Sequence, residues 1–498
     1  MTRQANDRVP GRMSVAGGAA LAVAMRWSDR LVGLASTLVL ARLLIPEDFG
    51  IVAMASIVVG LIDVLLDMGV AITLIRNRDA RQRDYDAAWT LRLLQSAVAA
   101  IALFLLAEPA AAYFRDARVA PVLQLLALSP LLAACENIGI VSFQKEMRFG
   151  MDFRFFVGKR ITGCMLALSA AWILQSYWAL VIGTLGGRLA GVALSYAMHP
   201  MRPRFDLAGV PAILSFSTWN LVRGIGNYLN EHAHRLVVGR RASTVVMGEY
   251  TVASEIAALP STELLAPLNR VMLPAFVEAK EDPERLREVF LLALGVQALI
   301  GIPAGAGMAL VARDAVLTLL GERWLAAVPF VQVIGFNNVV AALCTSGGYL
   351  MLALGRARVT AANTWLQVAL FVAAAVWLLP QEGPLAIAAL RLATAACGLA
   401  VFLFLIRGAL PGFSLAMFAA VVWRPCLAAG AMGLLLAWLP LPPLLPAPLR
   451  LLLATAAGAS AYAAALLLLW LAAGRPAGAE SWLLRKLRLF PRPGARPA

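Results

Sequence analysis

Long apolar runs recur from one end of this 498-residue sequence to the other, and only 14% of its residues are charged. A soluble globular protein has about 25% charged residues, whereas a membrane-spanning helix needs about 20 consecutive apolar ones. Fourteen candidate spans lie at about residues 14–44, 48–75, 87–107, 119–142, 153–174, 177–198, 211–236, 247–276, 286–312, 325–354, 359–379, 384–406, 415–439 and 448–474. We therefore predict an all-α polytopic membrane protein, because helices satisfy their own backbone hydrogen bonds in lipid.

A short polar break separates the first two runs. It reads Ala-Arg-Leu-Leu-Ile-Pro-Glu-Asp-Phe-Gly over residues 41–50. Pro46 should stop the first helix, and the acidic residues Glu47 and Asp48 suit the first turn of the next.

A fainter copy of this break appears 198 residues later. Arg42 matches Arg240 (240−42) and Gly50 matches Gly248 (248−50). The offset is about the length of six membrane helices with their loops. It predicts two pseudo-symmetric six-helix bundles, two additional helices and a tail. The expected boundaries are 1–205, 206–410, 411–474 and 475–498.

Lys and Arg in the connections show a roughly threefold excess on one side of the predicted membrane, although the Arg240–Arg241 pair lies on the other side. By the positive-inside rule both termini face the cytoplasm. The net charge of +15 is assigned to topology and to contact with anionic lipid headgroups, not to nucleic acid. The basic amphipathic stretch 481–490 is expected at the cytoplasmic interface, with a solvated tail as the alternative.

Several charged side chains lie inside the predicted spans, where each costs about 2.5–3.5 kcal/mol on insertion scales. Arg26, Asp29 and Arg30 share one face of the first helix by their spacing of three and four residues. Asp63 and Asp67 lie one turn apart in the second. These groups either pair to hold helices together or serve a ligand, and both interpretations stay open.

Two further charges in the first half need separate explanations. Lys159 lies near the start of the fifth span, where its long side chain is expected to reach the interface. Arg188 lies inside the sixth span.

The seventh span is the most polar one. Arg223, Asn227, Asn230 and His234 follow at i, i+4, i+7 and i+11, with Glu231 and Arg235 beside them. A polar stripe along most of a helix should line water or ligand, because lipid would leave it unsatisfied. Pairing among these side chains is the structural alternative.

Arginines outnumber the nearby acids in this predicted cavity, which indicates an anionic ligand. A guanidinium donates two parallel hydrogen bonds and suits phosphate, so several arginines would fit a diphosphate headgroup. The candidate substrate-binding residues are Arg26, Arg30, Arg188, Arg223, Asn227, Asn230 and Arg235.

No pattern for catalysis stands out. The sequence has no nucleotide-binding loop, no Ser-His-Asp arrangement and no acidic cluster in a predicted cytoplasmic loop. Its five cysteines lie inside apolar runs, and its three histidines do not form a metal-ligand pattern. We expect no catalytic residue, no metal and no cofactor, and hence not an enzyme.

Residues 41–55 closely resemble the signature of oligosaccharide flippases of the polysaccharide transporter family, within the multidrug/oligosaccharidyl-lipid/polysaccharide exporter superfamily. The resemblance extends from about residue 14 to 410, and beyond it only hydrophobicity agrees. Supporting segments are 144–149, 227–230, 235–239, 273–276, 320–324 and 354–356.

The resemblance implies two six-helix bundles that face each other as a V, with two extra helices. It implies movement of an undecaprenyl-diphosphate-linked sugar repeat across the bacterial inner membrane by rocking of the halves, for exopolysaccharide or lipopolysaccharide assembly. Expected partners are the lipid-linked oligosaccharide, membrane lipids, and the polymerase and chain-length proteins of the same pathway. No nucleic acid is expected.

One position departs from the family pattern. An aspartate usually precedes the arginine that matches Arg235, and this chain has His234 there. If that carboxylate takes part in ion coupling, the coupling is altered here or a neighbour such as Glu231 substitutes. The ion-coupling candidates are Asp29, Asp63, Asp67, Glu231 and His234.

Three other functions are the alternatives. A multidrug exporter or a lipid II flippase of the same superfamily would share the fold. A membrane polysaccharide polymerase or ligase would need a large external loop with catalytic residues, and no predicted external loop is long enough. A non-transporting scaffold would not explain the polar seventh helix.

Overall fold

The computed structural model describes residues 15–66, 74, 81–208, 210, 218–377, 382–439, 442 and 444–486. These residues form helices and the connections between them, with no strand among them. The chain divides into two compact units. The first contains residues 1–228 and 243–248, and the second contains residues 229–242 and 249–498. The expected all-helical class is therefore confirmed.

The helices of the first unit follow the predicted runs. They are α1 (Val15–Leu43), α2 (Pro46–Leu66), α4 (Gln82–Phe114), α5 (Val119–Leu126), α6 (Leu128–Cys135), η1 (Ile138–Ile140), α7 (Val141–Lys145), α8 (Phe149–Leu174) and α9 (Trp178–Met198). The helix α11 (Thr218–Arg241) starts in the first unit and ends in the second.

The second unit continues with longer helices. They are α12 (Thr244–Ala279), α13 (Pro283–Leu310), α14 (Ala312–Leu319), η2 (Glu322–Ala327), α15 (Val328–Ala353), α16 (Ala357–Trp377), α17 (Pro384–Ala409), α18 (Leu415–Trp438), α19 (Ala447–Ala472) and α20 (Ala479–Lys486). The first turn of α12, up to Gly248, belongs to the first unit.

Within the described ranges, ten helices are long and apolar enough to cross a membrane. An eleventh span is possible if the bent pair Val119–Cys135 and Ile138–Lys145 is counted as one. The helices α1 and α11 are not among the ten because charged side chains interrupt them. These observations establish a multi-pass membrane protein.

The polar break between α1 and α2 is held by its acidic side chains. Asp48 is buried and accepts hydrogen bonds from the backbone N–H groups of Ile45 (3.1 Å) and Tyr177 (2.8 Å), so it joins the starts of α2 and α9. Glu47 accepts from Arg118 (2.6 Å) in the loop after α4. The predicted stop of the first helix at Pro46 is confirmed, because α1 ends at Leu43 and α2 begins at Pro46.

The two glycines of the 198-residue offset lie at a close crossing of helices. A Cβ atom at Gly50 would overlap the carbonyl oxygen of Thr244, and one at Gly248 would overlap the carbonyl oxygen of Pro46. Thr244 is itself 198 residues after Pro46 (244−46), so the crossing is reciprocal. Only glycine lets the two backbones approach this closely.

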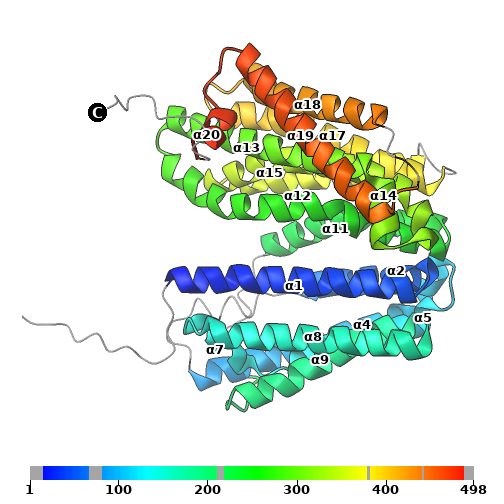
Figure 1. Ribbon diagram of the computed structural model, residues 1–498. Coiled ribbons are helices and arrows are strands. Elements are labelled where there is room, and N and C mark those ends of the chain that lie inside the picture. The colour runs from blue at the N-terminus through cyan, green and yellow to red at the C-terminus, as the bar shows by residue number, and fades with distance from the viewer. Residues whose placement is uncertain are drawn as a thin grey trace, which may run out of the picture. The chain divides into compact units, whose positions relative to one another are not determined.

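Helices α8 and α9 form the most extensive helix pair of the first unit and run side by side in Figure 1. Glycines allow this close packing: a Cβ at Gly163 would lie 3.1 Å from Gly187 Cα. Helix α1 also packs against α8 and completes the three-helix group that carries the site described below.

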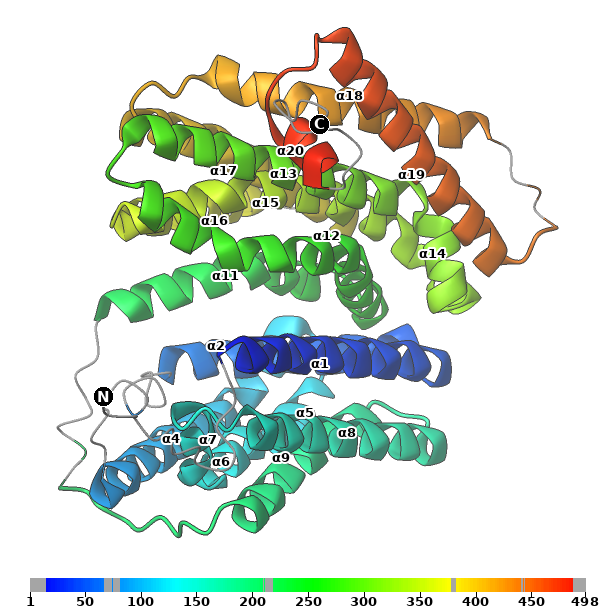
Figure 2. The same ribbon diagram turned by 60° about the vertical axis from the view of Figure 1, so that its left-hand side comes forward.

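In the second unit, α13, α15, α17 and α18 bury one continuous apolar core around Phe290, Phe402 and Met432. The short helix α20 lies beside α13 (Figure 2). Its first turn is buried: Ala479 lies against Gly295, and Glu480 pairs with Arg424 of α18 at 2.9 Å. The residues of the predicted interfacial stretch after Lys486 lie outside the described chain.

Candidate functional site

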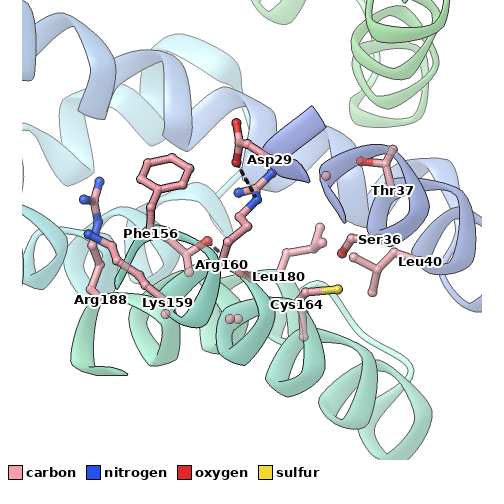
Figure 3. Close-up of a pocket in the computed structure, with 16 residues that line it drawn as sticks. Asp29, Ser36, Thr37, Leu40, Phe156, Lys159, Arg160, Cys164, Leu180 and Arg188 are labelled. Atoms are coloured by element: carbon pink, nitrogen blue, oxygen red, sulfur yellow. Dashed lines mark hydrogen bonds and ion pairs between the residues drawn. The ribbon is translucent and has the colours of Figure 1, made fainter. Parts of the chain in front are cut away.

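A cavity of about 420 Å³ opens between α1, α8 and α9 of the first unit. Small-ligand pockets commonly have volumes of about 300–1,000 Å³. Its lining, shown in Figure 3, consists of Asp29, Gly33, Ser36, Thr37, Leu40, Phe156, Lys159, Arg160, Gly163, Cys164, Ala167, Leu180, Gly183, Thr184, Gly187 and Arg188. The spacing of these residues places one face of each helix toward the cavity.

Three cations reach this cavity from two helices. Lys159 lies ten residues after the start of α8 at Phe149, and Arg188 ten residues after the start of α9 at Trp178. Ten residues correspond to about 15 Å along a helix, so both lie well inside their spans. Arg160, the neighbour of Lys159, is the third cation.

Each cation is held differently. Arg160 pairs with Asp29 of α1 at 3.2 Å, and both side chains stay about half exposed (Figure 3). Lys159 donates to the buried carboxylate of Glu136, which is not part of the lining. Arg188 donates to Ser129 Oγ at 3.2 Å and has no ion pair within the described part of the chain. The lining therefore carries three cations and one carboxylate, a balance that suits an anionic ligand.

A second cavity of about 320 Å³ meets the first at Arg188. It is lined by Asp63, Val64, Ser96, Pro130, Ala133 and Arg188. Arg188 thus lines both cavities, and Asp63 lines the second cavity with it.

In the second unit, the polar side chains described next are hydrogen-bonded to neighbouring helices and border little empty space. His234 is buried and its Nδ1 lies 2.7 Å from the hydroxyl of Tyr250 in α12. Arg391 of α17 donates to the backbone oxygen of Asn230. The cavity beside Asn230 and Arg391 measures only about 20 Å³, room for about one water molecule.

The structure therefore distributes the predicted site residues over several places. Asp29, Asp63 and Arg188 line the two cavities of the first unit. Asn230 and His234 belong to the closed cluster of the second unit. The remaining predicted residues line none of the described cavities: Arg26 and Arg30 on α1, and Arg223, Asn227, Glu231 and Arg235 on α11. Asp67 lies outside the described residues.

Sequence reasoning missed part of the site. The expectation that Lys159 reaches the interface is wrong, because its ammonium is bound to buried Glu136. Arg160 and Arg391, which line described cavities, are not among the residues predicted from the sequence. The sequence of α8 contained a pattern that could have predicted the site. Phe156, Lys159, Gly163 and Ala167 lie on one helical face, and this face combines a charge with two small side chains.

The chain is similar in sequence to several known proteins. The sequence profile of a family described as "Polysaccharide biosynthesis protein" matches residues 39–329, which is more than half of the chain. The lipopolysaccharide biosynthesis protein WzxC of Escherichia coli (strain K12) is 26% identical over 354 residues, 69% of this chain and 71% of WzxC. The succinoglycan biosynthesis transport protein ExoT of Rhizobium meliloti is 24% identical over 310 residues, 62% of this chain and 63% of ExoT.

Solved structures with the same fold are transporters. The lipid II flippase MurJ in an inward closed conformation superposes with a TM-score of 0.73 at 11% identity, covering 91% of this chain and 99% of MurJ. An inward-facing multidrug MATE transporter of the MOP superfamily gives 0.56 at 14% identity, covering 78% and 96%. At these identities the likeness concerns the fold alone.

Proposed function

This chain belongs to the polysaccharide biosynthesis protein family, and from that premise we propose that it is a flippase for an undecaprenyl-diphosphate-linked oligosaccharide. In this proposal the diphosphate headgroup lies in the cavity between α1, α8 and α9. Lys159, Arg160 and Arg188 bind its phosphate oxygens. The sugar repeat crosses the bacterial inner membrane for exopolysaccharide or lipopolysaccharide assembly.

The charge of the cavity is the observation that carries this proposal. Three cations and one carboxylate border about 420 Å³ well inside membrane-spanning helices. Charges at this depth are expensive unless they pair or bind a charged ligand. Arg188 has only a serine hydroxyl as its described partner, so a phosphate oxygen would supply the anion that it lacks.

Further parts of the proposal concern arrangement and partners. Fourteen spans would form two six-helix bundles facing each other as a V, with two extra helices, and both termini would be cytoplasmic. Rocking of the bundles would expose the cavity to each side in turn. Asp29 and Asp63 are the carboxylates at the cavities that could couple an ion. The protein would act as a transporter and not as an enzyme, beside the polymerase and chain-length proteins of its pathway.

Translocation in vesicles tests the proposal directly. Full-length protein is reconstituted with a fluorescent polyprenyl diphosphate disaccharide, and a membrane-impermeant quencher reports the lipid that reaches the outer leaflet. The wild-type protein should accelerate translocation. Lys159→Met should slow it at least about tenfold, because one charged hydrogen bond is worth about 1.5–3 kcal/mol.

Arg154→Gln is the matched control. Arg154 lies on the same helix α8, is exposed and lines none of the described cavities, so this variant should behave as the wild type. No acceleration by the wild-type protein would overturn the proposal. Export of a cationic dye without movement of the labelled lipid would favour a multidrug exporter.

A further inference from the structure

The carboxylate of Glu136 lies behind the cavity of the first unit and does not line it. Glu136 follows directly after α6, at the bend before η1, and is only 7% exposed. Its Oε1 accepts from Lys159, and its Oε2 lies 3.9 Å from Nη2 of Arg92 in α4. One buried carboxylate therefore faces several cations from different helices.

The bend that carries Glu136 is fixed by its neighbour Asn137. The Asn137 backbone N–H donates to Ser195 Oγ (2.9 Å), and its side-chain amide donates to the carbonyl of Met201 (2.7 Å). The side-chain oxygen of Asn137 accepts from the Gly139 N–H (3.0 Å). These bonds tie the bend to α9 and the segment after it, so Glu136 is held in place independently of Lys159.

Helix α9 leaves room for this carboxylate at Gly191. A Cβ at that position would overlap Glu136 Oε1 and crowd the side chain of Lys159. Gly191 lies three residues after Arg188, so the same face of α9 presents a cation to the cavity and a gap to Glu136. The cations that face the Glu136 carboxylate are thus Arg92 on α4 and Lys159 on α8, with Cys135 next to it in the chain.

The ammonium of Lys159 is therefore already paired with the Glu136 carboxylate, behind the cavity, before any ligand enters. We propose that Glu136 is an internal counter-anion that competes with the ligand's diphosphate for Lys159 and so lowers affinity enough for release. This inference rests on the proposed function and adds the residue that sets the strength of binding. When the diphosphate leaves, Glu136 neutralises Lys159, which would otherwise remain an unpaired charge at membrane depth.

Binding of geranylgeranyl diphosphate to the purified full-length protein tests the inference, with geranylgeraniol as the uncharged control. Glu136→Gln should bind the diphosphate about tenfold more tightly, because its neutral amide no longer competes for Lys159. It should also release the diphosphate more slowly. A merely structural role for Glu136 would produce weaker binding.

Three further variants sharpen the result. Glu136→Asp retracts the carboxylate by one methylene and should bind about threefold more tightly, which provides a second test if Glu136→Gln does not fold. In a Lys159→Met background, Glu136→Gln should change affinity much less than in the wild type, since the competition acts through Lys159. Glu249→Gln, a buried glutamate of α12 that lines none of the described cavities, should leave affinity unchanged.

The outcomes separate the two proposals. If the wild type binds geranylgeranyl diphosphate no better than geranylgeraniol, the proposed function fails and this inference fails with it. If the wild type prefers the diphosphate but Glu136→Gln and Glu136→Asp bind equally well or more weakly, only the role of Glu136 is overturned.

Discussion

Polar side chains inside the two units are surrounded in opposite ways. In the first unit, Arg188 borders cavities of about 420 and 320 Å³ and has a serine as its described partner. In the second, Arg391 and Asn230 close around about 20 Å³, and His234 is bonded to Tyr250. The first arrangement leaves room for a ligand, whereas the second uses its polar groups to join helices.

The difference shows that polarity alone does not mark a binding site in a membrane protein. A helix with many polar side chains becomes structural when its neighbours supply partners, as α17 and α12 do for α11. A helix with few polar side chains becomes a candidate site when those side chains line open space, as Lys159 and Arg188 do.

The largest expected effect concerns the buried ion pair between Arg424 and Glu480 of the second unit. Each side chain is only 8% exposed. If the charges of this unit hold its helices together, Glu480→Gln should lower the free energy of unfolding by about 3–5 kcal/mol. The reason is that Arg424 would remain buried without its anion. Thermal unfolding in detergent measures this loss, and the protein that stays folded should still bind the diphosphate lipid.

The exposed pair of Glu278 and Arg285, at 2.8 Å, provides the control. Glu278→Gln should change stability by less than about 1 kcal/mol. An unchanged unfolding temperature in Glu480→Gln, or a loss of binding without a loss of stability, would remove the contrast between the units.

An intermediate effect is expected when one arginine of each unit is changed in the same way. Arg188→Gln should weaken binding of geranylgeranyl diphosphate by about 1.5–3 kcal/mol while leaving abundance near normal. Arg391→Gln should do the reverse, lowering abundance while the folded fraction binds normally. Titration of purified protein and quantitative immunoblots separate the two. Equal loss of binding in both variants would extend the ligand site into the second unit.

The smallest effect is expected at the hydrogen bond of His234. Tyr250→Phe removes the hydroxyl but keeps the ring, whose centroid lies 5.3 Å from that of Phe330. Stability should fall by about 1 kcal/mol, the value of a typical neutral hydrogen bond, and translocation by the folded protein should not change. A translocation rate that drops while thermal stability is kept would instead give His234 a role in transport.

Much of the fold follows from local patterns in the sequence. The apolar runs predict the helices, and Pro46 predicts the end of α1, because both signals depend on neighbours in the chain. The bend at Glu136 and Asn137 has no such signal, since its partners Ser195 and Met201 are about 60 residues away.

The site was only partly predictable for the same reason. The choice of Arg188, Asp29 and Asp63 was possible because charges inside spans stand out in a hydrophobic sequence. Whether a charge faces space or a partner depends on the helix packed against it. The partner of Lys159 is 23 residues away, and that of His234 lies on the next helix, so spacing within one helix could not separate them.

The reciprocal crossing at Gly50 and Gly248 has the form that a two-fold axis produces in a homodimer, where residue i meets j and j meets i. Here both sides of the crossing belong to one chain, so the sequence around each glycine can differ while the local symmetry is kept. The contact is made by backbone atoms, so it constrains glycine at two positions and leaves the other side chains unrestricted.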